Sequence, residues 1–309
     1  MSAAMSDMTL VTDGLHFPEG PVALRDGRVV VVEIQSGTIT AVSPDGAKEV
    51  LATTGGGPNG AAIGPDGKLY VCNNGGFEWH DMQGMLAPGN QPADYIGGRI
   101  QRVDLTTGAV EDVYTECNGN PLRGPNDIVF DAHGGFWFTD LGKSRDREMD
   151  RGGLYYAQAD GSQVTEVIFP LITPNGVGLS PDGSKLYVAE TMTGRLWGWD
   201  ISSPGVLAAP AATPDNLLYD FPGFQLLDSL AVDDEGNVCV ATLITAAITV
   251  VSPAGELVAV HTVPQYDVFV TNICFGGDDL RTAYITSSGH GLLYSMPWPT
   301  AGLALEHGR

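Results

Sequence analysis

The sequence predicts an all-β fold, a six-bladed β-propeller of four-stranded blades, from three observations. Glycine and proline make up about a fifth of the 309 residues, well above the roughly 12% of an average protein. One sequence pattern recurs six times, and a short β-rich run follows each copy. Four-stranded sheets repeated every ~50 residues are typical of propellers. A β-sandwich is the alternative, but it does not need the same tripeptide in every unit.

The recurring pattern begins with a polar residue that usually follows a proline, and in five of six copies a glycine stands eight residues later. The six polar residues are Glu19, Asn59, Asn126, Asn175, Asp228 and Asn272. The runs that follow are Val29–Val32, Leu69–Cys72, Phe136–Thr139, Leu186–Ala189, Val238–Ala241 and Ala283–Thr286. Their β-rich composition, with glycine and aspartate between them, predicts strands. Each unit is expected to start with an inner strand and to meander outward.

Two further segments have expected places in this fold. The run Thr9–Thr12 is expected to complete the last blade, which would close the ring and remove its sheet edges. The second interval of the pattern is the longest, at 67 residues, and indicates an insertion at 73–97. Long loops in compact domains are usually functional, and this one contains Trp79 and His80. We expect one domain over residues 1–309 with the insertion as a lid candidate; a loop packed on its own blade is the alternative.

The chain is acidic, with 15 Lys+Arg against 37 Asp+Glu and a net charge of −22. This charge, without any basic run, excludes nucleic acid as a partner and disfavours anionic membranes. The longest apolar stretch, near Leu243–Val251, is far short of the ~20 residues of a membrane span, and the N-terminus has no signal-peptide pattern. The four cysteines form no CxxC pair, which favours free thiols and a cytoplasmic location. We expect a monomer or a small homo-oligomer.

In a propeller, residues at one repeat position meet at one mouth of the channel, so the six polar residues are expected to form a ring. All six side chains carry an oxygen, and two of them, Glu19 and Asp228, are carboxylates. Buried oxygens without partners are costly, and a divalent cation would satisfy them together. Such donors suit Ca²⁺ best, with Mg²⁺, Mn²⁺ or Zn²⁺ as other options. The alternative is that each Asn or Asp only makes a turn before its strand.

Four motifs carry a specific resemblance. They are Glu-Gly-Pro at Glu19, Pro-Asn-Asp at Asn126 before Phe-Asp-Ala-His-Gly-Gly-Phe-Trp-Phe-Thr-Asp, Pro-Asn-Gly-Val-Gly-Leu-Ser-Pro-Asp-Gly at Asn175, and Asp-Ser-Leu-Ala-Val-Asp-Asp-Glu-Gly at Asp228. In this order they resemble the SMP-30/gluconolactonase/LRE family over nearly the whole chain. The resemblance implies a six-bladed propeller with a divalent metal that hydrolyses lactones or, in some relatives, phosphorus esters. It implies Glu19, Asn175 and Asp228 as metal ligands, with Asn126 as a fourth ligand or a substrate contact.

The resulting hypothesis is metal-dependent hydrolysis of a small lactone to its hydroxy acid, the lactone being sugar-like or a more apolar aliphatic or aromatic one. Asp228 is the expected catalytic residue, as general base or nucleophile. The expected substrate-binding residues are Asn126, Asn59, Arg123, Trp79, His80 and Asn272. A phosphotriesterase-like hydrolase using the same metal site and a non-catalytic Ca²⁺-binding propeller are the alternatives. The charged loop 143–151 is expected to be solvated and salt-bridged, with a grip on an anionic substrate as the alternative.

Overall fold

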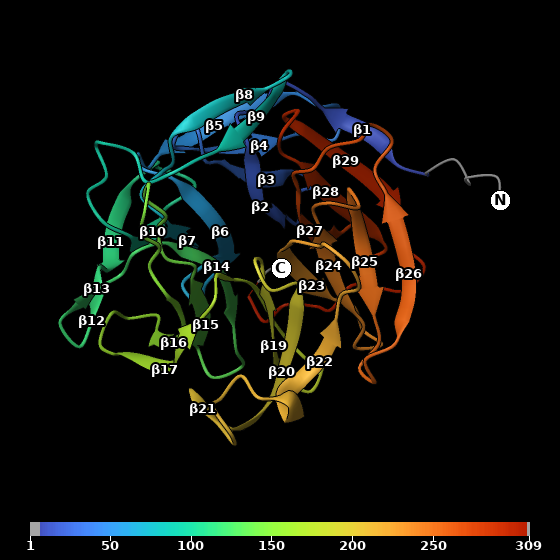
Figure 1. The fold of residues 1–309 in the computed structure, drawn as a ribbon. Helices are drawn as coiled ribbons and strands as arrows, with labels where there is room; N and C mark the ends of the chain where they lie inside the picture. The colour runs from blue at the N-terminus through green and yellow to red at the C-terminus, as the bar shows by residue number, and fades with distance from the viewer. Residues whose placement is uncertain (1–6, 308–309) are drawn as a thin grey trace.

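The computed structural model describes residues 7–307, and in this part of the chain the strands form six sheets of four or five strands around a central axis (Figure 1). The other strands form two-stranded hairpins, β8 (Trp79–Met82) with β9 (Met85–Pro88) and β12 (Glu116–Cys117) with β13 (Asn120–Pro121). No helix within these residues is long and apolar enough to cross a membrane. The predicted six-bladed propeller is confirmed.

Each blade starts with a strand at the axis and proceeds outward. Blade 1 contains β2 (Pro18–Ala23), β3 (Val29–Glu33), β4 (Thr38–Val42) and β5 (Lys48–Thr53), and blade 2 contains β6 (Pro58–Ile63), β7 (Leu69–Asn73), β10 (Arg99–Val103) and β11 (Val110–Tyr114). Blade 3 contains β14 (Pro125–Phe130), β15 (Gly135–Asp140), β16 (Gly152–Gln158) and β17 (Val164–Leu171). Blade 5 contains β23 (Leu227–Val232), β24 (Val238–Thr242), β25 (Ala247–Val251) and β26 (Leu257–Thr262). In every blade the second strand matches the predicted run and extends it by one residue at one or both ends.

The N-terminal strand completes blade 6, as expected. The sheet order is β1 (Thr9–Thr12), β29 (Leu292–Pro297), β28 (Thr282–Ser287) and β27 (Val270–Gly276), so the outermost strand comes from the other end of the chain. Thr9 lies opposite Ser295 and Leu10 opposite Tyr294. The ring is therefore closed by backbone hydrogen bonds between the two ends of the described chain.

Blade 4 differs from the four-stranded pattern. Its first strands are β18 (Pro174–Leu179), β19 (Lys185–Glu190) and β20 (Arg195–Ser203), and β20 is long enough to pair with two outer segments. The start of β20 pairs with β22 (Leu217–Asp220), and its end pairs with β21 (Val206–Leu207). The chain between these two segments contains the 3₁₀ turn Pro214–Asn216. Blade 4 therefore has five strands, and its two short outer strands, β21 and β22, both pair with β20.

The core lies between neighbouring blades, because alternate residues of a strand face opposite sides of its sheet. In β3, Val30 and Val32 pack with Leu69 of blade 2, whereas Val29 and Val31 pack on the other side towards blade 6. This two-sided burial explains why β3 begins with four consecutive valines. Such interlocked packing holds the six inner strands at fixed positions around the axis.

Candidate metal-binding and catalytic site

The six polar repeat residues lie on the six inner strands, at the same end of every blade. Neighbouring inner strands contact one another around the whole axis, and β27 closes the circle on β2. In each blade the first residue of the inner strand pairs with the last residue of the second strand, as Pro18 does with Glu33 and Pro174 with Glu190. The register shifts directly after this pair in five of the inner strands, and one residue later, after Glu19, in β2. Such bulges re-aim side chains and are common beside active sites.

Burial separates Asp228 from the other five ring residues. Glu19, Asn59, Asn126, Asn175 and Asn272 are 2–6% exposed, whereas Asp228 is half-buried. Five oxygen-bearing side chains are thus withdrawn from water. Asp228 is the ring residue with the most access to solvent.

Glu19 is held in place by the neighbouring blade. Asn272 Nδ2 donates a hydrogen bond to Glu19 Oε2 at 2.8 Å, and the Gly20 N–H donates to the same oxygen at 2.8 Å. The Asn272 amide oxygen accepts the N–H of Ile273 at 2.8 Å. Asn272 therefore turns its nitrogen towards Glu19, while its oxygen already has a partner. This geometry makes Asn272 a clamp on the Glu19 carboxylate.

Asn175 shows the opposite arrangement. Its Nδ2 donates to Thr191 Oγ1 at 3.1 Å, and its Oδ1 is buried without a hydrogen-bond partner. An unsatisfied buried acceptor costs about 1–3 kcal/mol, and a cation at the ring would remove this cost. Within residues 7–307 no three His, Cys, Asp or Glu side chains gather into a metal-binding group. The ring therefore fits a cation through amide and carboxylate oxygens together, which is the donor set that Ca²⁺ prefers.

The carboxyl groups near the ring have raised pKa values. Burial raises the pKa of Glu19 to about 7. Burial, and then the nearby charge of Glu19, raise the pKa of Asp228 well above its ordinary value. Burial also raises the pKa of Asp127, the residue after Asn126, to about 6. Opposite charge favours the ionised form of a carboxyl group, so these groups together form an environment that favours a cation.

Buried acceptors fix the loops that lead into four of the inner strands. Each is the last residue of a second strand, and each accepts one or two backbone N–H groups just upstream of the inner strand at 2.7–3.0 Å. These residues are Glu33, Asn73, Asp140 and Glu190. Because their acceptors are buried beside the turn, the main chain before Glu19, Asn59, Asn126 and Asn175 has a defined position.

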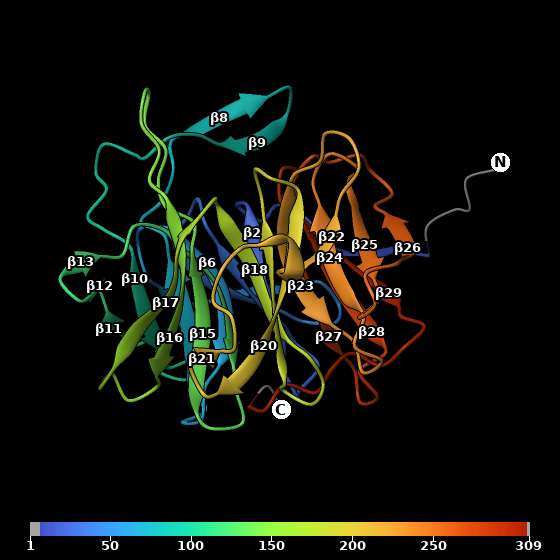
Figure 2. The same cartoon turned by 60° about the horizontal axis from the view of Figure 1, so that its bottom comes forward.

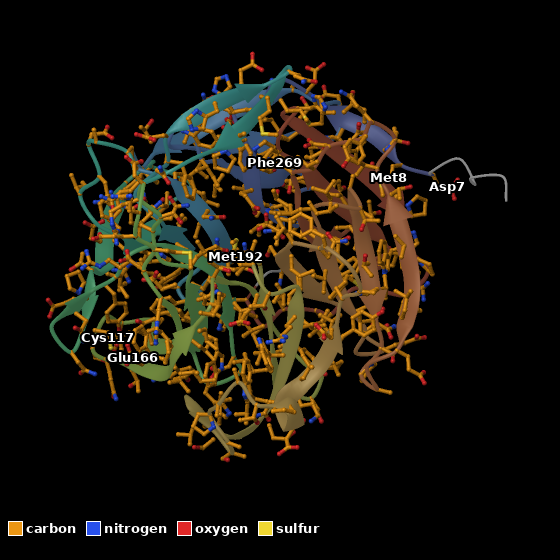
Figure 3. All side chains as sticks on the ribbon, in the orientation of Figure 1. Asp7, Met8, Cys117, Glu166, Met192 and Phe269 are labelled. Atoms are coloured by element: carbon orange, nitrogen blue, oxygen red, sulfur yellow. The ribbon has the colours of Figure 1, made fainter. Side chains whose placement is uncertain are left out.

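Apolar side chains flank this mouth. Phe17, which precedes the strand of Glu19, packs against Trp79 and Phe269 with ring centroids 5.1 and 5.6 Å away. Met192 follows the second strand of blade 4 at the same end and is 59% exposed. Figure 3 labels Phe269 and Met192 on this face. The surface around the ring is therefore partly apolar.

The insertion 73–97 leaves blade 2 at this mouth and stands above it (Figure 2). Leu86 N–H donates to the Gly289 carbonyl of blade 6 at 2.8 Å, and Gln91 N–H donates to the Ser144 carbonyl of blade 3 at 2.8 Å. The hairpin β8–β9 runs over blade 1 rather than across the axis (Figure 1). The insertion thus contacts blades other than its own.

The remaining predicted substrate contacts occupy different places. Trp79 and His80 are neighbours on β8 and face opposite sides of the hairpin; Trp79 packs on Phe17, and His80 is exposed. Arg123 is exposed, but its main chain is fixed, because its carbonyl accepts the Tyr95 hydroxyl at 2.5 Å. Asn59 and Asn126 remain buried ring members.

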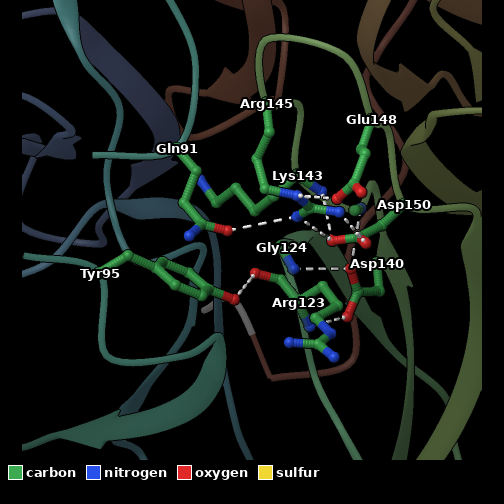
Figure 4. Close-up of polar contacts among 10 residues, drawn as sticks. Gln91, Tyr95, Arg123, Gly124, Asp140, Lys143, Arg145, Glu148 and Asp150 are labelled. Atoms are coloured by element: carbon green, nitrogen blue, oxygen red, sulfur yellow. Dashed lines mark hydrogen bonds and ion pairs between the residues drawn. The ribbon is translucent and has the colours of Figure 1, made fainter. Parts of the chain in front are cut away.

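The loop 143–151 carries the ion pairs expected of it (Figure 4). Arg145 pairs with Asp150 at 2.7 Å and with Glu148 at 3.3 Å. Arg145 Nη1 also donates to Gln91 Oε1 of the insertion at 3.4 Å. The loop therefore braces the insertion from blade 3.

Lys143 departs from the expectation of a solvated loop, because its side chain is buried and 1% exposed. Its Nζ donates to the Gly76 carbonyl at 2.6 Å and to Asn74 Oδ1 at 3.2 Å, and it lies 3.8 Å from the centre of the Phe77 ring. Burial lowers the pKa of Lys143 to about 7. The insertion supplies all three contacts, which sequence reasoning could not anticipate from a loop of mixed charge.

Sequence reasoning also missed a polar pair beside the ring. Asp127 and Ser229 directly follow Asn126 and Asp228, and Ser229 Oγ donates to Asp127 Oδ2 at 2.5 Å. Three of the six repeats have glycine at this position, so the departure from glycine was the available signal. Asp127 also lines a cavity of about 540 Å³, together with other inner-strand residues and Leu303.

Comparisons with known proteins identify relatives over most of the chain. Lactonase drp35 of Staphylococcus saprophyticus is 32% identical over 268 residues, which are 85% of this chain and 73% of the relative. Lactonase drp35 of Staphylococcus haemolyticus is 33% identical over 74% of this chain and 64% of its own length. The solved structure of a gluconolactonase from Xanthomonas campestris has a TM-score of 0.74 at 22% identity, covering 97% of this chain and 93% of that chain. Regucalcin from Agrobacterium tumefaciens, described as a calcium-binding protein, has a TM-score of 0.75 at 19% identity, covering 97% and 99%.

The two solved structures show the same fold. The family model of the SMP-30/Gluconolactonase/LRE-like region matches residues 17–289, a span that contains all six ring residues. With its repeat, its ring and this match, the chain belongs to the SMP-30/gluconolactonase/LRE-like family.

Proposed function

We propose that this protein hydrolyses a small lactone to its hydroxy acid with one divalent cation at the ring, Ca²⁺ in preference to Mg²⁺, Mn²⁺ or Zn²⁺. The observation that carries the proposal is the ring of oxygen donors at one mouth, with Asn175 Oδ1 buried and unpartnered. The curated relatives named lactonase support hydrolysis of a lactone as the reaction. The absence of nitrogen and sulfur donors from the expected ligands supports Ca²⁺.

Glu19, Asn126, Asn175 and Asp228 would hold the cation. When bound, such a cation polarises a substrate carbonyl and lowers the pKa of a water molecule. Asp228, as general base, takes a proton from the water that attacks the lactone carbonyl carbon. The ring C–O bond then breaks, and the leaving oxygen takes up the proton that Asp228 holds, which completes the hydroxy acid and restores the base. Glu19 contributes the second negative charge and is kept in place by Asn272 and Gly20.

We further propose that the lactone is apolar, aliphatic or aromatic, rather than a bare sugar lactone. Phe17, Trp79 and Phe269 form an aromatic group beside the mouth, and Met192 exposes its side chain there. Aromatic and apolar walls bind substrates by excluding water from apolar surface. The insertion 73–97 would form one wall of the substrate site.

The test combines metal content and activity in one sample. The protein is stripped with a chelator, refilled with Ca²⁺, Mg²⁺, Mn²⁺ or Zn²⁺, and assayed by proton release with γ- and δ-lactones and with phosphotriesters. Activity on lactones that is lost on stripping and restored by refilling is the expected result. Turnover of phosphotriesters alone would replace the lactonase by a phosphotriesterase. Metal binding without any turnover would indicate a non-catalytic propeller.

The cysteines support a reducing compartment, and we propose the cytoplasm. Cys72, Cys117 and Cys239 are free and buried, and Cys274 is free and half-buried. Burial raises the pKa values of these thiols, which keeps them protonated and unreactive.

A further inference from the structure

We propose that Asp127 is a positioning residue that, together with Ser229, sets the relative positions of the ring residues of blades 3, 4 and 5. The proposal rests on the metal centre of the proposed function. Asp127 follows Asn126 on β14, and its side chain crosses from blade 3 to β18 and β23. Both Asp127 and Ser229 are buried, at 6% and 2% exposed. We call this pair the Asp127–Ser229 strut.

The strut joins three strands next to three ring residues. Asp127 Oδ2 accepts hydrogen bonds from Ser229 Oγ at 2.5 Å and from the Val177 N–H at 3.1 Å, and Oδ1 accepts the Ile128 N–H at 2.9 Å. Ser229 is the residue after Asp228, and Val177 is two residues after Asn175. One carboxylate therefore links the main chains that carry Asn126, Asn175 and Asp228.

Glycines at the same repeat position make room for the strut. A Cβ on Gly176 would stand 2.6 Å from the Leu230 nitrogen and 2.7 Å from the Ser229 carbonyl carbon. A Cβ on Gly60 would stand 2.5 Å from the Asp127 Cα and 2.6 Å from its Oδ1. Blades 2 and 4 thus leave empty the space that the Asp127 carboxylate of blade 3 and the main chain at Ser229 of blade 5 occupy. The fit accounts for glycine at Gly60 and Gly176 beside Asp127 and Ser229.

The hydrogen bonds of the Asp127 carboxylate are strong enough to fix the relative positions of the strands they join. Hydrogen bonds to an ionised carboxylate are roughly twice as strong as those between neutral groups. Ca²⁺ ligands must converge to about 2.3–2.6 Å from the ion. If the strut is lost, β14, β18 and β23 lose a direct side-chain link between the main chains that carry three ring residues. The expected consequence is weaker cation binding, in addition to any loss of stability.

A second aspartate of blade 3 provides a matched control for a purely structural role. Asp131 lies four residues further along, beyond the far end of β14, and is 8% exposed. It accepts the N–H groups of His133 and Gly135 at 2.8 and 3.1 Å, and the Tyr156 hydroxyl at 2.8 Å. Asp127 and Asp131 thus have the same number and kind of hydrogen bonds. Only Asp127 lies beside the ring.

The experiment compares wild type, Asp127→Asn, Asp131→Asn and Ser229→Ala. Calorimetry measures Ca²⁺ binding, urea unfolding in chelator measures stability without metal, and kcat and KM are measured with the best lactone. Both Asp→Asn variants are expected to unfold at lower urea. Asp127→Asn alone is expected to weaken Ca²⁺ binding about tenfold or more, with kcat falling more than KM changes. Ser229→Ala is the milder variant, which keeps the carboxylate and shows a smaller loss in the same direction.

The outcomes separate this inference from the proposed function. Ca²⁺ affinity that is as high in Asp127→Asn and Ser229→Ala as in Asp131→Asn overturns the positioning role. A wild type that binds none of the four cations overturns the metal centre and the strut with it. A wild type that binds Ca²⁺ but hydrolyses no lactone refutes only the enzymatic proposal, and the calorimetric comparison still decides the role of Asp127.

Discussion

Replacing Lys143 with methionine is expected to change how the stability of the protein depends on pH. The Lys143 ammonium is buried between blade 3 and the insertion, and burial lowers its pKa from 10.5 to about 7. The unfolded chain therefore binds more protons than the folded chain between these two values. The free energy of unfolding of the wild type consequently rises with pH across this window. The methionine side chain of the Lys143→Met variant would retain much of the packing but cannot titrate.

The magnitude follows from the size of the shift. One proton contributes at most about 1.4 kcal/mol per pH unit, so the window from about 7 to 10.5 corresponds to a gain on the order of 5 kcal/mol. The titratable neighbours Asp140 and Tyr95 remain in the variant. Burial raises the pKa values of both groups, so Tyr95 stays neutral through most of the window. The difference between wild type and variant therefore isolates Lys143.

Urea unfolding in chelator at pH 7, 8 and 9 measures the effect. Wild-type stability minus Lys143→Met stability is expected to grow by about 1 kcal/mol for each pH unit. Lys185→Met is the control, because its side chain is 46% exposed and pairs with Asp200 at the surface. It should keep the pH slope of the wild type. Parallel pH profiles of Lys143→Met and the wild type would refute the burial of a titrating ammonium.

Two further predictions concern the site. Asp228→Asn is expected to lower kcat for lactone hydrolysis by about 10²–10⁴-fold, measured in parallel with Ca²⁺ binding; a variant that binds metal and keeps full activity would remove Asp228 as the base. Trp79→Ala is expected to raise KM for aromatic lactones severalfold and to leave sugar lactones less affected, because it removes the ring packed against Phe17. His80→Ala, on the other side of the same strand, is the control, and equal effects of the two substitutions on KM would contradict the apolar wall.

The fold was predictable because the repeat encodes both the strand pattern and the register. Glycines at a constant distance from the ring residues end the inner strands, and valine-rich or aromatic runs such as Val29–Val32 then form the second strands. The closure by Thr9–Thr12 was also predictable, because the last unit would otherwise lack an outer strand. The two outer segments of blade 4 were not, since a long β20 and a nonrepetitive connection leave their pairing open.

In the candidate site, only the features that recur in every repeat were predictable from the sequence. That the six ring residues lie at the same end of the propeller follows from their shared repeat position. The separate roles of Asn272 and Asn175 depend instead on the orientation of each side-chain amide. The contacts of Asp127 and Lys143 could not be predicted from the sequence. Their partners lie on other blades or in the insertion, at sequence distances that follow no period. A sequence pattern records which side chains are available, and only packing decides which of them meet.

The pairing of β1 with β29 has a consequence for how the molecule is made. Thr9–Thr12 leaves the ribosome about 280 residues before its partner Leu292–Pro297. At about 5–20 residues per second, the first strand waits on the order of tens of seconds before it can pair. During that time it is an unprotected strand beside a growing set of open sheets. Correct closure of the propeller therefore depends on keeping Thr9–Thr12 unengaged until Leu292–Pro297 has been made.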